Sequence, residues 1–105
     1  MRPETASDRV LSPEARIAVP AHVVYRSFPT ETVVLNLETG KYHGLNPTAG
    51  RMIEAVERAG SVRAAAPQIA EEFEQPQAAV ERDMHDLCQM LLERRLIEIE
   101  RRNGR

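Results

Sequence analysis

The run from Thr32 to Pro47, TVVLNLETGKYHGLNP, constrains the fold most strongly, because two strand-like segments lead directly into a helix start. Its first part, TVVLNL, is rich in β-branched residues, which favour strands. The loop Glu38-Thr39-Gly40 suits a three-residue hairpin turn, because glycine readily adopts the left-handed conformation that the last turn position requires. A helix is predicted to begin at Asn46-Pro47, since Asn is a favoured cap and Pro sacrifices no hydrogen bond at the first helical position.

The loop length sets the expected register of this hairpin. The predicted pairs are Leu37 with Lys41, Leu35 with His43, and Val33 with Leu45. Alternate residues of an antiparallel strand direct both backbone groups to the same neighbour. His43 is therefore predicted to bond back into the sheet, while Tyr42 and Gly44 direct their N–H and C=O groups outward.

Three helices are predicted after the strands. The first begins at Pro47 and ends at Gly60, and Ser61 caps the second. Pro67 costs roughly 3 kcal/mol in a helix interior, so the regular part of the second helix is predicted to start near Ala66.

The third helix is predicted from Gln77 to Arg95, because apolar residues recur there every three or four positions. The stripe consists of Val80, Met84, Leu87 and Leu91, widened by Cys88 and Leu92. A further strand is predicted at 22–28, HVVYRSF, ahead of the hairpin. The order therefore predicts an α+β fold, in which a three-stranded antiparallel sheet is followed by three helices.

The chain has 105 residues, which is enough for one small domain. Residues 1–15 mix charge, Ser and Pro without periodicity and are expected to be flexible, 16–100 to form the domain, and 101–105 to be a polar tail. Cys88 has no second cysteine with which to form an internal disulfide and fits a reducing cytosol, so a cytoplasmic location is expected. No apolar run is long enough for a membrane span or a signal peptide.

The sequence lacks the usual signatures of catalysis, such as a phosphate-binding glycine loop or a zinc-protease motif. His85 and Cys88 could share a metal with His43 or His22, but two ligands on one helix do not make a site. The expectation is therefore no enzyme, no cofactor and no metal, with Cys88 buried and His85 solvated.

The second and third predicted helices resemble a helix-turn-helix unit, which raises DNA binding as an alternative. The third helix carries Glu81, Asp83, Asp86 and Glu93 against Arg82, Arg94 and Arg95. This slightly acidic balance repels phosphate, so no nucleic-acid partner is expected.

The segment KYHGL is predicted to be an edge strand, because TVVLNL pairs with HVVYRSF on its other side. Edges are commonly protected by charge, proline or bulges, and Lys41 supplies one charge only. An accessible edge beside a helix with the soft side chains Met84 and Cys88 suits strand addition by an extended peptide. The N-terminal segment or a dimer partner could cover the same edge, and the residues alone leave these alternatives open.

Two stretches, VVLNLETGKYHGLNPTAGRMIEAV and VERDMHDLCQMLLERRLIEI, resemble the PqqD-like family. The resemblance covers about Val19 to Ile99, and its most specific part is Gly40-Lys41-Tyr42 followed by Leu45-Asn46-Pro47. It implies a winged-helix-like domain that recognises the leader segment of a ribosomally made precursor peptide. In such domains the leader adds beside the third strand and lies against the third helix.

Carried over to this chain, the resemblance implies a non-catalytic peptide-binding protein, either a monomer or a weak homodimer. A leader aromatic side chain is expected between the third strand and the third helix. The expected binding residues are Lys41, Tyr42, His43, Gly44, Leu45, Val80, Asp83, Met84, Leu87 and Cys88. The chain most resembles the stand-alone leader-binding protein of lasso peptide biosynthesis, whose partners are a leader peptidase and a macrocyclase. A peptide chaperone for pyrroloquinoline quinone biosynthesis is the alternative.

Overall fold

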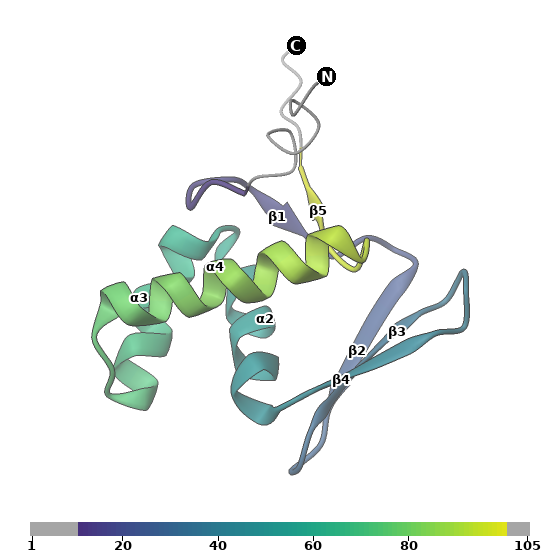
Figure 1. Cartoon of the computed structure of the whole chain (residues 1–105), viewed down its shortest axis with the longest axis horizontal. Helices are drawn as coiled ribbons and strands as arrows, with labels where there is room; N and C mark the ends of the chain where they lie inside the picture. Colours follow the sequence, from purple (N-terminus) through teal and green to yellow (C-terminus); the bar gives the residue numbers. More distant parts are fainter. Residues whose placement is uncertain (1–10, 101–105) are drawn as a thin grey trace.

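The computed structural model describes residues 11–100 and confirms the predicted α+β order of three antiparallel strands followed by three helices (Figure 1). The sheet has the order β2-β3-β4, so that β3 is central. Figure 1 shows the helices on one side of the molecule and this sheet on the other. The strands are β2 (Val23–Ser27), β3 (Thr32–Asn36) and β4 (Tyr42–Leu45), and the helices are α2 (Pro47–Ala59), α3 (Val62–Phe73) and α4 (Gln77–Glu93).

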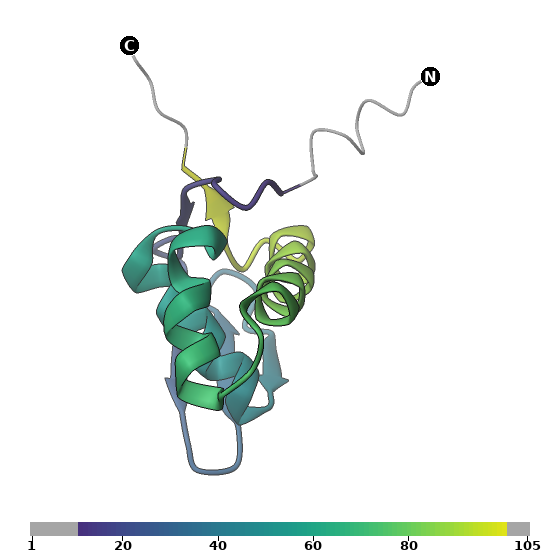
Figure 2. The same ribbon diagram turned by 90° about the vertical axis from the view of Figure 1, so that its left-hand side faces the viewer.

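A second, two-stranded sheet was not predicted. It pairs β1 (Ile17–Ala18) with β5 (Glu98–Ile99) in antiparallel register, and Figures 1 and 2 show these strands side by side at one end of the molecule. The backbone N–H of Ile17 also donates to the carbonyl of Gly60 at 2.8 Å. Strands of two residues are too short to show an alternating pattern, so sequence periodicity gives no sign of them.

The predicted hairpin register is wrong by one residue on β3. The pairs are Leu35 with Tyr42, Val34 with His43, Val33 with Gly44, and Thr32 with Leu45. The turn starts earlier than expected because the Asn36 side chain accepts hydrogen bonds from the backbone N–H groups of Glu38 and Thr39. Asn36 N–H then donates to the carbonyl of Lys41 at 2.9 Å, which leaves residues 37–40 as the loop. Gly40 has φ 76°, as the left-handed turn position requires.

The predicted ends of α2 are confirmed, and the start of α3 is corrected. Asn46 caps α2 by accepting from the N–H of Ala49, and Gly60, with φ 97°, ends the helix. The helix α3 begins at Val62 and not near Ala66, because the Ser61 cap starts the helix before Pro67 is reached. Pro67 lies on the exposed side, where water can hydrate the carbonyl that lacks its helical partner.

The helix α4 ends two residues before the predicted Arg95. Leu96 N–H donates to Leu91 C=O and Arg95 N–H to Leu92 C=O, which is the hydrogen-bond pattern of a Schellman helix end. Arg95 occupies the left-handed position of this motif, with φ 62°, where glycine is the usual residue.

The core lies between the helices and the inner face of the β2-β3-β4 sheet. On α4 the buried stripe is Val80, Met84, Cys88 and Leu91, while Leu87 and Leu92 are half-buried at its margins. The sequence therefore placed Leu87 too centrally and Cys88 too near the margin.

The N-terminal segment contributes Leu11 to this core, although residues 1–15 were expected to be flexible. The Leu11 side chain is 1% exposed, and its N–H donates to the side-chain oxygen of Gln89. The expectation of a solvated His85 is wrong, because its ring is half-buried and Nε2 donates to the Leu11 carbonyl at 2.7 Å. The earlier part of that segment, 1–10, and the predicted polar tail, 101–105, lie outside the described residues.

Candidate functional site

The outer edge of β4 presents unpaired backbone groups. Within residues 11–100, β4 pairs with β3 alone. Because the Lys41 carbonyl accepts from Asn36 on β3, the alternation of an antiparallel ladder directs His43 towards β3 as well. Tyr42 and Gly44 therefore direct their N–H and C=O groups to the open side. The one-residue shift on β3 leaves this alternation on β4 as the sequence predicted it.

The side chains of β4 divide between the two faces of the sheet. Lys41 and His43 face the end of α4, and Leu45 is buried in the core. Tyr42 lies on the opposite face and is 70% exposed. Its cross-strand neighbours there, Leu35 and then Val24, continue an apolar row across the sheet. Of the predicted β4 residues, Tyr42 and Gly44 can thus contribute backbone groups to the edge, and Lys41 and His43 can contribute side chains beside α4.

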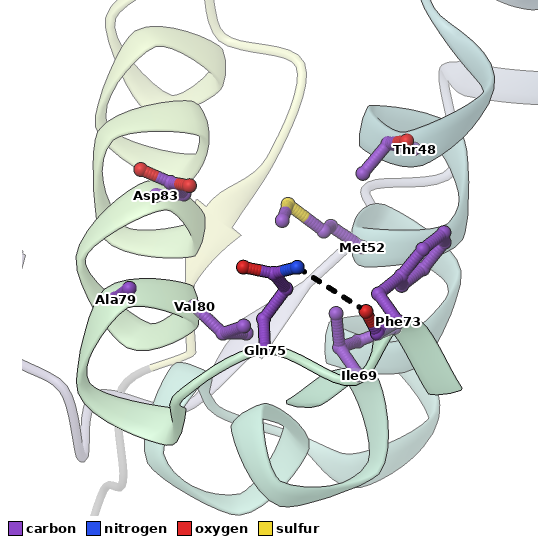
Figure 3. Close-up of a pocket in the computed structure, with 8 residues that line it drawn as sticks. All are labelled: Thr48, Met52, Ile69, Phe73, Gln75, Ala79, Val80 and Asp83. Atoms are coloured by element: carbon purple, nitrogen blue, oxygen red, sulfur yellow. Dashed lines mark hydrogen bonds between the residues drawn. The ribbon is translucent and has the colours of Figure 1, made fainter. Parts of the chain in front are cut away.

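A pocket of about 260 Å³ lies where the start of α4 meets α2 and α3 (Figure 3). Figure 3 shows side chains from the three helices pointing into one space, with Gln75 donating to the Phe73 carbonyl. We call it the apolar pocket, and its lining consists of Thr48, Met52, Ile69, Phe73, Gln75, Ala79, Val80 and Asp83. Asp83 is the one formally charged residue among them.

A second pocket, of about 340 Å³, lies between the β3–β4 hairpin and the end of α4. We call it the basic pocket, and its lining consists of Asn36, Thr39, Lys41, His43, Arg94, Arg95 and Leu96. Arg94 donates to Nδ1 of His43 across this pocket at 3.2 Å. His43 on β4 lines the basic pocket, and Thr48, just after β4 at the start of α2, lines the apolar pocket. The two pockets therefore lie near opposite ends of β4 and beside opposite ends of α4.

The predicted α4 residues separate into accessible and buried groups. Asp83 is exposed at the apolar pocket and Leu87 is half-buried, whereas Val80 lines the pocket but is only 4% exposed. Met84 and Cys88 are 0% and 1% exposed, so they belong to the core and offer no surface to a guest in this conformation. Burial raises the pKa of the Cys88 thiol to about 12, because the apolar surroundings disfavour the thiolate.

The sequence alone did not indicate the contributions of α2 and α3 to the apolar pocket, namely Met52, Ile69 and Phe73. These residues carry only the ordinary apolar pattern of helices, which does not distinguish a pocket wall from a core. It also did not indicate the role of Arg94 and Arg95 in the basic pocket. Their signal was a pair of adjacent cations at the C-terminal end of a predicted amphipathic helix.

Within the part of the chain that the structure describes, no group of three His, Cys, Asp or Glu residues could hold a metal ion. In the same residues, no helix has the length and apolar character needed to cross a membrane.

Comparison with known proteins places these features in context. The family model described as coenzyme PQQ synthesis protein D (PqqD) matches residues 31–97. Comparison with curated proteins finds no significant match. Among solved structures, TbiB1 in complex with the TbiA(beta) leader peptide is 27% identical, covers 81% of this chain and 99% of its own, and has a TM-score of 0.70.

Two further structures share the fold. A lasso peptide synthetase B1 complexed with its leader peptide is 23% identical, with a TM-score of 0.70 over 80% of this chain and 99% of its own. The solution structure of the PqqD truncation of Methylobacterium extorquens PqqCD, a functional stand-alone RiPP recognition element, is 20% identical. Its TM-score is 0.72 over 87% of this chain and 98% of its own.

Proposed function

The chain belongs to the PqqD family, and we propose from this premise that it is a non-catalytic protein that captures the leader segment of a ribosomally synthesised precursor peptide. The observation that carries the proposal is the outer edge of β4, where the backbone groups of Tyr42 and Gly44 have no partner within residues 11–100. An extended peptide that adds to this edge continues the sheet as a fourth strand.

Strand addition supplies part of the affinity. Tyr42 and Gly44 offer two donors and two acceptors, and each backbone hydrogen bond contributes about 0.5–1.5 kcal/mol net. Because association and ordering of the peptide oppose this gain, side chains of the guest must supply more. Main-chain pairing also carries little information about sequence, so specificity must come from the pockets beside α4.

The apolar pocket is the proposed site for a large apolar or aromatic side chain of the guest. Phe73 is the most exposed apolar side chain of its lining, and the buried residues Met52, Ile69 and Val80 complete that lining. Burying one aromatic ring there contributes about 1.5–3 kcal/mol. The guest thus lies along β4 and inserts one side chain between α4 and the two preceding helices.

We propose that the protein presents the bound leader to a leader peptidase and a macrocyclase in lasso peptide biosynthesis, as a monomer or weak homodimer. The fold and the 27% identity shared with TbiB1 in its leader complex support this assignment. The family description and the fold of the Methylobacterium extorquens PqqD support the alternative, a chaperone for the precursor of pyrroloquinoline quinone. The identity of the guest peptide distinguishes the two.

The test begins with the protein purified from cells that express it naturally, and bound peptides are released and sequenced by mass spectrometry. We expect the leader segment of a short precursor, which is then synthesised and is called below the captured peptide. In a heteronuclear NMR titration, the captured peptide should slow hydrogen exchange at the amides of Tyr42 and Gly44. Binding without added protection at these two amides, or recovery of no peptide at all, would overturn the proposal.

A further inference from the structure

The basic pocket has an uncompensated positive charge. Lys41, Arg94 and Arg95 line it, and no acidic residue does. None of these three forms an ion pair with a carboxylate of residues 11–100, whereas Arg16, Arg51 and Arg63 all do. Arg26, Arg58 and Arg82 likewise form no ion pair within residues 11–100, so three of the six cations without a carboxylate partner there line this one pocket.

Arg95 adopts a backbone conformation that is unfavourable for a residue other than glycine. It occupies the left-handed position of the helix end, with φ 62°, where a glycine fits without strain. Non-glycine residues in this conformation carry a conformational cost, and such costs concentrate at functional sites. The strain and the unpaired charge meet at the same residue.

The other end of β4 has the opposite character. The apolar pocket contains one carboxylate, Asp83, and no cation. A guest strand along β4 therefore meets an apolar site with a negative rim at one end and a positive site at the other. We propose that the guest peptide carries an acidic side chain that binds in the basic pocket, at a fixed spacing from the large apolar residue in the apolar pocket. This inference rests on the proposed function.

The geometry gives the spacing. Asp83 and Arg94 are eleven positions apart along α4 and its cap, which corresponds to about 16 Å at the rise of an α-helix. An extended strand covers that distance in about five residues. Since alternate residues of a strand face the same side, the two anchor residues should be separated by an even number, about four or six positions. The direction of the guest strand decides which anchor comes first.

A carboxylate suits this pocket better than a nucleic-acid phosphate. Lys41 and His43 stand on β4 itself, so a guest strand places a side chain directly opposite them. Arg94 adds a planar guanidinium that can bind a carboxylate through two parallel hydrogen bonds. A nucleic acid needs a track of cations, and the pocket at the other end of β4 offers Asp83 instead.

The test uses a phage library of random twelve-residue peptides selected on the full-length protein. We expect Asp or Glu to be enriched at an even spacing from an aromatic or large apolar residue. Charge reversal by Lys41→Glu with Arg94→Glu should replace this enrichment by Lys or Arg. The matched control is Arg26→Glu, an exposed cation of β2 outside both pockets, which should keep the parental preference.

For a selected peptide, replacing its Asp by Asn, or its Glu by Gln, should weaken binding roughly threefold to tenfold, and added salt should reduce that difference. Arg95→Gly should raise the urea midpoint of the free protein and lower the preference for the acidic peptide. Retention of the full preference in Arg95→Gly would remove Arg95 from the site.

Two outcomes separate this inference from the proposed function. Peptides that bind the parent, lose binding to Gly44→Pro and show no acidic position would overturn the inference alone, and so would an acidic position that survives charge reversal. Peptides that bind Gly44→Pro as well as the parent would overturn strand addition, and the inference with it.

Discussion

Arg94, the residue that follows α4, donates a hydrogen bond to Nδ1 of His43 on β4, with 3.2 Å between the two nitrogen atoms. Since Nδ1 is the acceptor, the neutral imidazole carries its proton on Nε2. The bond holds the guanidinium over the strand at the end of β4 where the basic pocket lies. Because both side chains reach solvent, the bond contributes about 1 kcal/mol or less, and a guest carboxylate can replace it at small cost.

The apolar pocket can be closed without opening the core. Ala79 lines it from α4 and is half-buried, so Ala79→Phe should fill the pocket with the ring that a guest would otherwise insert. Affinity for the captured peptide should fall about tenfold or more, with no loss of unfolding free energy. Fluorescence anisotropy and urea denaturation measure the two effects.

Met84→Ala should affect stability, unlike Ala79→Phe. The Met84 side chain is fully buried, so its truncation leaves a cavity and should lower the unfolding free energy by about 2–5 kcal/mol. Full affinity for the captured peptide in Ala79→Phe, with the protein folded, would place the guest side chain elsewhere.

The thiol of Cys88 reports whether the core opens beside α4. Burial raises the pKa of this thiol to about 12, so little of the reactive thiolate is present in the native state. The side chain is also only 1% exposed, so a reagent cannot reach it directly. At pH 8, iodoacetamide should label native protein at least about a hundredfold more slowly than protein in urea, as followed by intact mass. Fast labelling of the native protein would instead support the guest-facing position of Cys88 that the family resemblance implies.

Gly50 lies within helix α2, but the packing of α2 leaves no room there for a Cβ atom. A Cβ atom at this position would lie 1.9 Å from Oγ1 and 2.7 Å from Cβ of Thr32, which is 1% exposed. The Thr32 hydroxyl is also within 2.8 Å of the Ser27 hydroxyl, so its rotation breaks a hydrogen bond. Gly50→Ala should therefore lower the unfolding free energy by about 1–3 kcal/mol in urea denaturation.

Two further variants test this explanation of Gly50→Ala. In a Thr32→Ala background the cost should be smaller, because the closest atom is gone. Gly44→Ala is the matched control, since a Cβ there meets only the end of the flexible Glu31 side chain. Equal costs for Gly50→Ala in both backgrounds would contradict the clash with Thr32.

The contrast between Gly44 and Gly50 illustrates what the sequence can predict. The alternation of β4 followed from a glycine-containing turn and a helix cap close by in the chain, and these local rules held. The predicted register on β3 was wrong because the side chain of Asn36 starts the turn one residue earlier than expected. The close approach of Gly50 to Thr32 depends on how α2 packs on the sheet, which no local pattern records.

The edge strand was predictable because strand order follows from consecutive hairpins. The pockets were not, because each gathers residues from elements that are distant in sequence, such as Met52 with Val80 and Lys41 with Arg94. Helical periodicity identified an apolar stripe on α4, yet it could not tell the buried Met84 from the half-buried Leu87.

Acid should weaken the contact between α2 and α3. Arg51 donates two hydrogen bonds to Glu72, at 2.9 and 2.7 Å, which lowers the pKa of that carboxyl. A lowered pKa contributes stability above the ordinary carboxyl pKa, and this stability is lost as the pH falls through the folded-state value. Because the pair is partly exposed, we expect about 1 kcal/mol or less.

The measurement is urea denaturation at pH 7 and pH 3. Glu72→Gln should lose less unfolding free energy between these two pH values than the parent does. Glu71→Gln is the control, because this neighbouring carboxylate forms no ion pair with residues 11–100. An identical loss in Glu72→Gln and the parent would contradict the role of the pair.

The backbone of β4 supports the sharpest prediction. The N–H of Gly44 faces the open edge, so Gly44→Pro removes one donor available to a guest and leaves the bonds between β3 and β4 intact. His43 directs its N–H at Val34, and His43→Pro therefore breaks the ladder.

We expect Gly44→Pro to fold with the circular dichroism of the parent and to lose affinity for the captured peptide about tenfold or more in fluorescence anisotropy. Gly44→Ala keeps the N–H and should bind nearly as well as the parent, because the Glu31 side chain can move aside. His43→Pro should unfold. Of these two substitutions at Gly44, only proline removes the backbone N–H donor. If Gly44→Pro nevertheless binds the captured peptide as tightly as Gly44→Ala, the guest does not pair with this edge.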